Sequence, residues 1–142
     1  MLNKKSFTLI ELIVVIIIIG ILAALALPGF GVTKERALDK EAKANLTFVQ
    51  EAERFYKMES DSYYPASEST SVISDINTNL KISLPTGGVL SWIYTVYNVD
   101  ASNRKATATR NVTGGRVWTL TFTGDTSCCT GTDCPTGSAC PP

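Results

Sequence analysis

The feature that most constrains this chain is one long apolar run near its N-terminus. From Phe7 to Leu27 the run carries a single charged side chain, Glu11, and contains no proline. At about 1.5 Å per residue a helix of this length extends about 31 Å, which is enough to cross the hydrocarbon core of a bilayer. Because the run is apolar on every side, it lacks the wet face of an ordinary surface helix. We therefore predict a membrane-spanning helix.

Charged residues at the start of this run predict its orientation and a functional position. Lys4 and Lys5 precede the run, whereas residues 29–33 after it carry no charge. Positive charge on the N-terminal flank predicts that this end stays in the cytoplasm and that the rest of the chain is exported. An acid in such a helix costs on the order of 2.5–3.5 kcal/mol on insertion scales, so Glu11 is expected to have a functional partner.

Together these residues resemble the N-terminus of type IV pilins and pseudopilins. The shared pattern is Lys4-Lys5-Ser6, then Phe7-Thr8-Leu9-Ile10-Glu11-Leu12, then Gly20 and Pro28 in a long apolar run. The resemblance implies a leader, residues 1–6, which a prepilin peptidase cleaves between Ser6 and Phe7, followed by N-methylation of Phe7. Ser6 stands before the cleaved bond, where the family usually has glycine.

The resemblance also implies a fold and a function. The fold is an α+β type IV pilin fold, in which a long helix, hydrophobic and then amphipathic, packs on a three- to four-stranded antiparallel sheet followed by a disulfide-tied loop. The function is that of a subunit inserted in the inner membrane as a prepilin and then polymerised into an extracellular or periplasmic filament. The implied partners are copies of itself, prepilin peptidase, the inner-membrane assembly platform and the lipid bilayer.

Phe7 and Glu11 are the candidate assembly residues. After cleavage the new amino group of Phe7 is a positive charge about one helical turn from Glu11. In a filament of staggered helices, Glu11 of one subunit can pair with the Phe7 ammonium of its neighbour. An unpaired charge is costly in a dry environment, so this pairing would select the axial register. The alternative is that Glu11 only extends to the lipid headgroups.

Pro28 ends the predicted membrane helix, residues 7–28. Proline lacks the backbone N–H and clashes with the preceding turn, so it is expected to kink or loosen the helix there. The resemblance implies that the segment from Gly20 to Gly31 can melt and extend when subunits pack. The simpler interpretation is that the helix leaves the membrane at this point.

An amphipathic helix is expected next, from Pro28 to about Glu59, in the region 29–60. Apolar side chains recur every three or four residues and form one stripe that is expected to pack under a sheet. The pairs Asp39–Lys43 and Glu53–Lys57 are expected on exposed faces. The stripe comprises Leu38, Ala42, Asn45, Val49, Ala52 and Tyr56, widened by Phe48 and Phe55.

The region 91–123 predicts an antiparallel sheet. Strands are expected at Ser91–Val99, Arg104–Val112 and Arg116–Thr123 from their β-branched and aromatic content and from the turns between them. Three strands with one apolar face need a cover, which the amphipathic helix supplies. Residues 61–90, which include the turn at Tyr64-Pro65, are expected to form the variable loop of the family. Spaced aliphatic residues between Ala66 and Pro85 suit a short helix or strand that is pinned to the core.

The tail, residues 124–142, holds all four cysteines of the chain. Export favours disulfides, and no Cys-x-x-Cys pair suggests zinc. A bond between adjacent cysteines would be strained, which favours two crossing or nested bridges. The tail has almost no apolar side chains, so it is expected to lie outside the core. The cysteines are Cys128, Cys129, Cys134 and Cys140.

Composition excludes several functions. The chain has no histidine, and it shows no phosphate-loop or dinucleotide-binding motif. We expect no enzymatic activity, catalytic residue, cofactor or metal. Removing Lys4 and Lys5 from 13 basic and 13 acidic side chains leaves a formal charge of −2, which gives no bulk reason for nucleic-acid binding. Four basic residues are interpreted as a solvated face of the sheet, with DNA contact left open: Arg104, Lys105, Arg110 and Arg116.

Three functions remain. The first is a type IV pilus subunit, and the second is a pseudopilin of a type II secretion system. The third is a secreted binding domain whose signal peptide is cleaved near Ala24-Leu25-Ala26; Glu11 and the length of the apolar run weigh against it. Major pseudopilins usually carry an acidic calcium-binding loop near the end. Here the acids after the last predicted strand are only Asp125 and Asp133, which favours the pilin.

Overall fold

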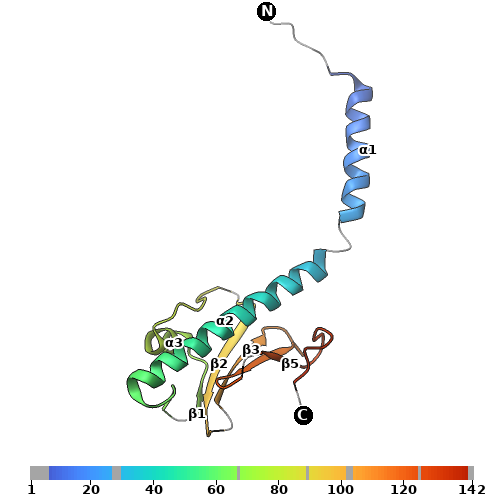
Figure 1. Cartoon of the computed structure of the whole chain (residues 1–142). Coiled ribbons are helices and arrows are strands. Elements are labelled where there is room, and N and C mark those ends of the chain that lie inside the picture. Colours follow the sequence, from blue (N-terminus) through green and yellow to red (C-terminus); the bar gives the residue numbers. More distant parts are fainter. Residues whose placement is uncertain are drawn as a thin grey trace, which may run out of the picture. The chain divides into compact units, whose positions relative to one another are not determined.

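The computed structural model describes residues 7–26, 30–66, 68–88, 90–101, 104–124 and 126–140. The chain divides into two compact units, residues 1–37 and 38–142 (Figure 1). The leader, with Ser6, lies outside the described residues, as do Leu27 and Pro28 at the end of the predicted membrane helix.

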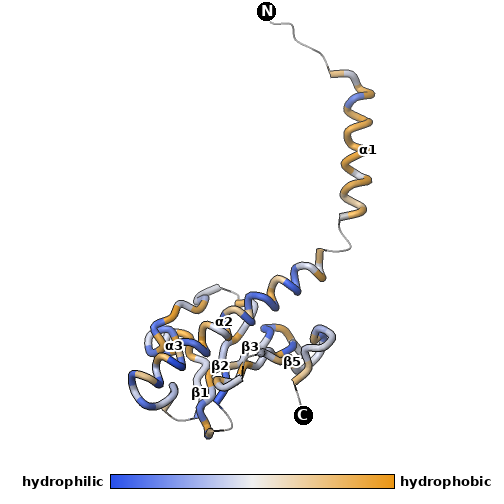
Figure 2. Tube along the Cα trace, viewed as in Figure 1, coloured by the Kyte–Doolittle hydropathy of each residue, from blue (hydrophilic) through white to orange (hydrophobic). Residues whose placement is uncertain are grey.

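The first unit contains helix α1, Leu9–Ala26. Its described side chains, from Leu9 to Leu25, are all exposed, and apart from Glu11 in the first turn they are apolar on every side of the helix (Figure 2). Gly20 lies inside α1, and a Cβ at this position would meet no described atom within 4 Å outside the helix's own backbone. Within the described residues no single helix meets the length and hydropathy expected of a membrane span, whereas Leu9–Leu25 and Phe30–Ser60 meet them together.

Helix α2, Phe30–Ser60, supplies the cover of the sheet. Its stripe is centred on Ala42, Leu46 and Val49, each of which is at most 1% exposed. The prediction that Phe48 and Phe55 widen this stripe is wrong, because they are 63% and 64% exposed. At about 100° per residue they lie more than a quarter of a turn from that central line, on a different face.

The sheet is antiparallel throughout and follows chain order. Figure 1 shows α2 lying across it. The register aligns Tyr94 with Ala108, Ala108 with Trp118, and Trp118 with Cys129. All four side chains are buried in the core. The strands are β1 Glu68–Thr70, β2 Trp92–Asn98, β3 Arg104–Arg110, β4 Val117–Thr121 and β5 Cys128–Thr130.

The expected α+β class is confirmed, with one correction to the sheet. The described residues form five strands instead of three to four. The variable loop adds β1 at one edge and also forms helix α3, Ile73–Leu80, which buries Ile76. The tail adds β5 at the other edge. The prediction that the tail lies outside the core is therefore wrong: Cys129 is 2% exposed, because it pairs with Trp118 in the register of the sheet.

Candidate assembly site

The start of α1 is built by reciprocal hydrogen bonds between Thr8 and Glu11. The backbone N–H and the hydroxyl of Thr8 donate to Glu11 Oε2, at 3.2 and 3.1 Å. The Glu11 N–H in turn donates to Thr8 Oγ1 at 3.3 Å. This is a capping box, which satisfies N–H groups that a helix leaves unpaired at its first turn. The Thr-x-x-Glu spacing is its sequence signal, although the role of Thr8 was not predicted.

The capping box gives Glu11 a role within its own helix. A carboxylate in the first turn lies at the positive end of the helix dipole, where negative charge is stabilised by about 0.3–1 kcal/mol. Phe7 lies directly before Thr8 and is exposed. Cleavage before Phe7 would therefore place a new ammonium group beside the carboxylate that caps the helix. Pairing between subunits stays a prediction.

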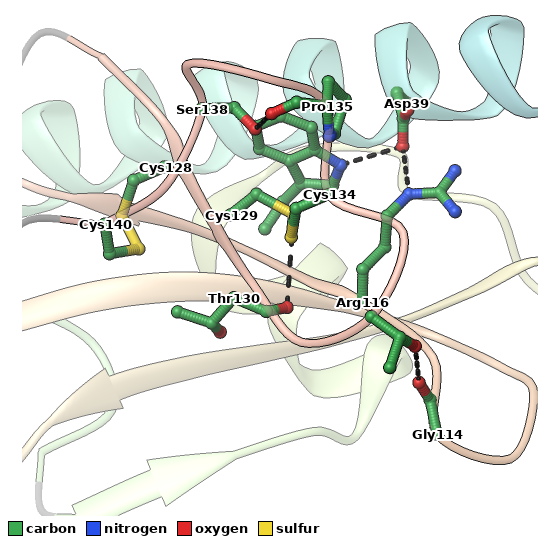
Figure 3. Close-up of a disulfide and its surroundings, with 12 residues drawn as sticks. Asp39, Gly114, Arg116, Cys128, Cys129, Thr130, Cys134, Pro135, Ser138 and Cys140 are labelled. Atoms are coloured by element: carbon green, nitrogen blue, oxygen red, sulfur yellow. Dashed lines mark hydrogen bonds and ion pairs between the residues drawn. A yellow bond between two sulfur atoms is a disulfide. The ribbon is translucent and has the colours of Figure 1, made fainter.

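A buried ion pair joins α2 to the sheet in the second unit. The guanidinium Nε of Arg116 donates to Asp39 Oδ1 at 2.7 Å, and the indole Nε1 of Trp118 donates to the same oxygen at 2.9 Å (Figure 3). Asp39 and Arg116 are 7% and 5% exposed. The expected exposed Asp39–Lys43 pair is wrong, because Lys43 instead lies 3.9 Å from the Trp118 ring centre. Asp39 turns inward because two donors satisfy its charge there.

A second acid of α2, Glu53, is completely buried. Its Oε2 accepts a hydrogen bond from the Tyr64 N–H at 3.0 Å, and none of the described residues supplies a hydrogen-bond partner for Oε1. Burial raises the pKa of Glu53 to about 8, although the Tyr64 hydrogen bond opposes this shift. The expected exposed Glu53–Lys57 pair is therefore wrong: Lys57 lies over the Tyr63 ring. Below about pH 8 Glu53 is an uncharged hydrogen-bonding group that holds the loop after α2.

The cysteines form two nested disulfides, Cys128–Cys140 around Cys129–Cys134 (Figure 3). The Thr132 hydroxyl donates to the Gly114 carbonyl, which ties the tail to the turn between β3 and β4. Gly131 has φ +100°, and a Cβ there would lie 3.2 Å from the Arg116 Cα. Cys128 and Cys129 belong to β5, so the two bridges hold the rest of the tail against the sheet. No cluster of three or more potential metal ligands occurs among the described residues.

The basic residues of the sheet do not share one solvated face. Arg116 is buried, so its interpretation as a solvated residue is wrong. Arg104 lies over the Tyr63 ring, Lys105 over Tyr97 and Arg110 over Trp92. Their cationic groups are therefore occupied by aromatic rings of the same domain, an arrangement that stabilises the sheet surface.

Comparisons with known proteins agree with the N-terminal pattern. The prokaryotic N-terminal methylation motif matches residues 1–27. The chain is 46% identical to the type IV major pilin protein PilA of Myxococcus xanthus over 61 residues, which are 43% of this chain. Over the same length it is 41% identical to the type IV wide pilus major component PilA4 of Thermus thermophilus and 37% identical to the type II secretion system core protein G of Escherichia coli.

The matched segments cover 28%, 47% and 42% of these three relatives, so the chain matches less than half of each. No solved structure matches. The resemblance to type IV pilins and pseudopilins is thus confirmed for the N-terminal segment. Relatives of both kinds match the chain, so the comparisons do not distinguish a pilin from a pseudopilin.

Proposed function

We propose that the chain is a structural subunit of a type IV pilus. In this proposal it is inserted in the inner membrane as a prepilin, cleaved between Ser6 and Phe7, N-methylated at Phe7 and polymerised through its N-terminal helix. The proposal rests mainly on α1, whose described side chains are exposed and, apart from Glu11 in its first turn, apolar on every side. The methylation motif over residues 1–27 supports the processing step.

The physical argument concerns what can cover α1. An apolar helix without a wet face is stable only in lipid or against other apolar surfaces. Lipid can cover it in the precursor, and the helices of other subunits can cover it in a filament. Apolar packing alone cannot select one register, because lipid tails are as apolar as the helix itself. Glu11 supplies the missing specificity by pairing with the Phe7 ammonium of a neighbour.

A pseudopilin of a type II secretion system is the second candidate. It is favoured by the 37% identity to the type II secretion system core protein G over 61 residues. Two features of the tail favour the pilus subunit instead. The sequence offers only Asp125 and Asp133 as acids after β4. Nested disulfides order the tail, so that region has no need of a bound cation for its order.

Mass spectrometry of the exported chain tests the processing step. The intact mass and N-terminal sequence of the mature protein should correspond to a methylated chain that begins at Phe7. A chain that begins at Leu27 would instead indicate an ordinary signal peptide and would contradict the proposal. Deletion of the gene separates the two candidates. Loss of surface filaments with normal enzyme secretion supports the pilus, and loss of secretion supports the pseudopilin.

A further inference from the structure

The second unit has an apolar groove on the part of α2 that faces away from the sheet. Phe48 and Phe55 are 63% and 64% exposed on this side. They are seven positions apart in sequence, so they lie on one face of the helix about 10.5 Å apart along its axis. Single exposed apolar residues are common, but two aromatic rings aligned beside a hollow are a typical mark of an interaction surface.

Two adjoining hollows form this groove between α2 and the segment that ends α3. The larger has a volume of about 380 Å³ and includes Phe55, Tyr56 and Leu80 in its lining. The smaller has a volume of about 280 Å³ and includes Asn45 and Leu84. Phe48 and Ile82 line both hollows, so the groove is continuous along the helix. It lies wholly within the second unit, where α3 stands beside α2 (Figure 1).

The charges at the rim of the groove are already neutralised within the chain. Arg54 pairs with Glu51 at 2.9 Å, and Lys81 pairs with Glu59 at 3.1 Å. A rim without excess positive charge does not attract a polyanion such as DNA or an anionic membrane surface. It also does not repel a molecule of the same net charge. The groove therefore suits an apolar partner whose own surface charges are balanced.

A second copy of this chain meets these requirements, and the course of the helix favours it. Helix α2 is uninterrupted from Phe30 to Ser60, so the groove lies on the helix that directly follows the proposed polymerisation segment. Only three residues of sequence, 27–29, connect α1 to α2, so copies joined through α1 raise the effective concentration of each other's α2. Each copy also presents exposed apolar side chains that can fill a groove, among them Phe48 and Phe55 themselves.

We propose that the groove formed by Phe48, Phe55, Tyr56 and Ile82 is a contact surface for a second copy of this chain in the filament. The proposal rests on the proposed function, which supplies the filament. It adds a site on the folded domain that the N-terminal helix does not provide. The two aromatic side chains form the centre of the contact, and the neutralised pairs Glu51–Arg54 and Glu59–Lys81 form its rim.

Charge substitutions in the full-length chain test the surface. Phe48→Glu and Phe55→Glu should each lower the yield of sheared filaments about tenfold or more. A charge at the centre of an interface removes the apolar contact made by the aromatic ring, and loss of a central contact typically weakens association by at least this factor. The membrane pool of the chain and the thermal melting temperature of the purified protein should stay close to wild type. Val112→Glu is the matched control, since Val112 is 57% exposed and lies outside the groove. Normal filament yield from both phenylalanine variants would overturn the proposal.

Photo-crosslinking identifies the occupant. Benzoylphenylalanine at Phe55 should give an adduct between two copies of the chain in sheared filaments, and the same amino acid at Val112 should give much less. Adducts only to lipid or to a different protein would overturn the proposal. If the wild type forms filaments and both groove variants form them in normal yield, this inference is wrong and the proposed function still stands. Absence of filaments from the unmodified chain would remove both.

Discussion

The two helices of this chain use acidic residues in opposite ways. Glu11 of α1 is exposed, and its carboxylate accepts hydrogen bonds from Thr8, only three residues away. Asp39 of α2 is buried, and its partners, Arg116 and Trp118, are 77 and 79 residues away. When the partner of an acid is close in sequence, its role can be inferred from the neighbouring residues. When the partners are distant, its role becomes apparent only when the chain is folded.

Of the substitutions that test this contrast, replacing Glu11 should have the largest effect, which is on filament formation. We expect Glu11→Leu to abolish filaments, because it removes the charge that can pair with the Phe7 ammonium of the next subunit. Insertion into the membrane should be unchanged or improved, since the helix becomes uniformly apolar. The measurements are electron microscopy of sheared filaments and the amount of processed chain in the membrane. Normal filaments from a normally processed variant would show that Glu11 is not the assembly contact.

Removing Asp39 should have the largest effect on stability. Asp39→Ala leaves the Arg116 guanidinium buried without its 2.7 Å partner. Loss of one member of a buried ion pair typically costs about 3–5 kcal/mol. Urea unfolding of the purified disulfide-bonded protein measures this cost. Lys40→Ala, at the exposed neighbouring position, is the control and should change stability by less than about 0.5 kcal/mol. Equal stability of the two variants would mean that the ion pair does not hold α2 on the sheet.

Because Glu53 is buried, we expect the free energy of unfolding to fall as the pH rises. In the folded state the pKa of Glu53 is about 8, whereas its ordinary value is 4.5. Between these values the unfolded chain has lost the proton that the folded chain still holds, so raising the pH favours unfolding. Glu53→Gln mimics the protonated acid and does not titrate. The variant and the wild type should be similar near about pH 5, and the variant should be more stable by a few kcal/mol near about pH 8.

Thermal melts of both proteins across this pH range provide the measurement. Glu51→Gln is a suitable control, because Glu51 is exposed and pairs with Arg54 on the surface. Its melting temperature should follow that of the wild type at every pH. Parallel curves for wild type and Glu53→Gln would show that burial of the Glu53 carboxyl does not determine the pH dependence.

The sequence predicted what depends on local pattern. The apolar run of α1, the periodicity of α2 and the turn at Gly114, which has φ +69°, all follow from neighbouring residues. The burial of Glu53 did not follow, because a charged residue at a core position resembles a surface pair until the Tyr64 N–H meets it. Strand β5 was also missed. Three residues rich in cysteine carry no strand signal, and only their pairing with β4 makes them one.

The same distinction between local pattern and tertiary contact applies to the candidate site. Glu11 was singled out as an acid in an apolar run and Phe7 through the resemblance to type IV pilins, and their role in assembly stays a prediction. The nested disulfides were among the pairings left open. The exposed groove was hidden, because Phe48 and Phe55 fit a widened apolar stripe equally well in sequence. Which face of α2 the sheet covers is decided by Trp92, Trp118 and Leu46 packing together, which is a tertiary property.

The smallest expected effect separates the two roles of Glu11. Thr8→Val removes the hydroxyl that accepts from the Glu11 N–H and donates to its carboxylate, but it keeps the Thr8 backbone N–H and the charge of Glu11. Loss of a capping side chain costs about 1 kcal/mol of helix stability. Filament yield should therefore fall only slightly, whereas Glu11→Leu abolishes it. Thr8→Ser keeps the hydroxyl and should match the wild type. If Thr8→Val were as defective in assembly as Glu11→Leu while Thr8→Ser stayed normal, Glu11 would act in assembly through its helix cap, and the proposed pairing with a neighbouring Phe7 would be wrong.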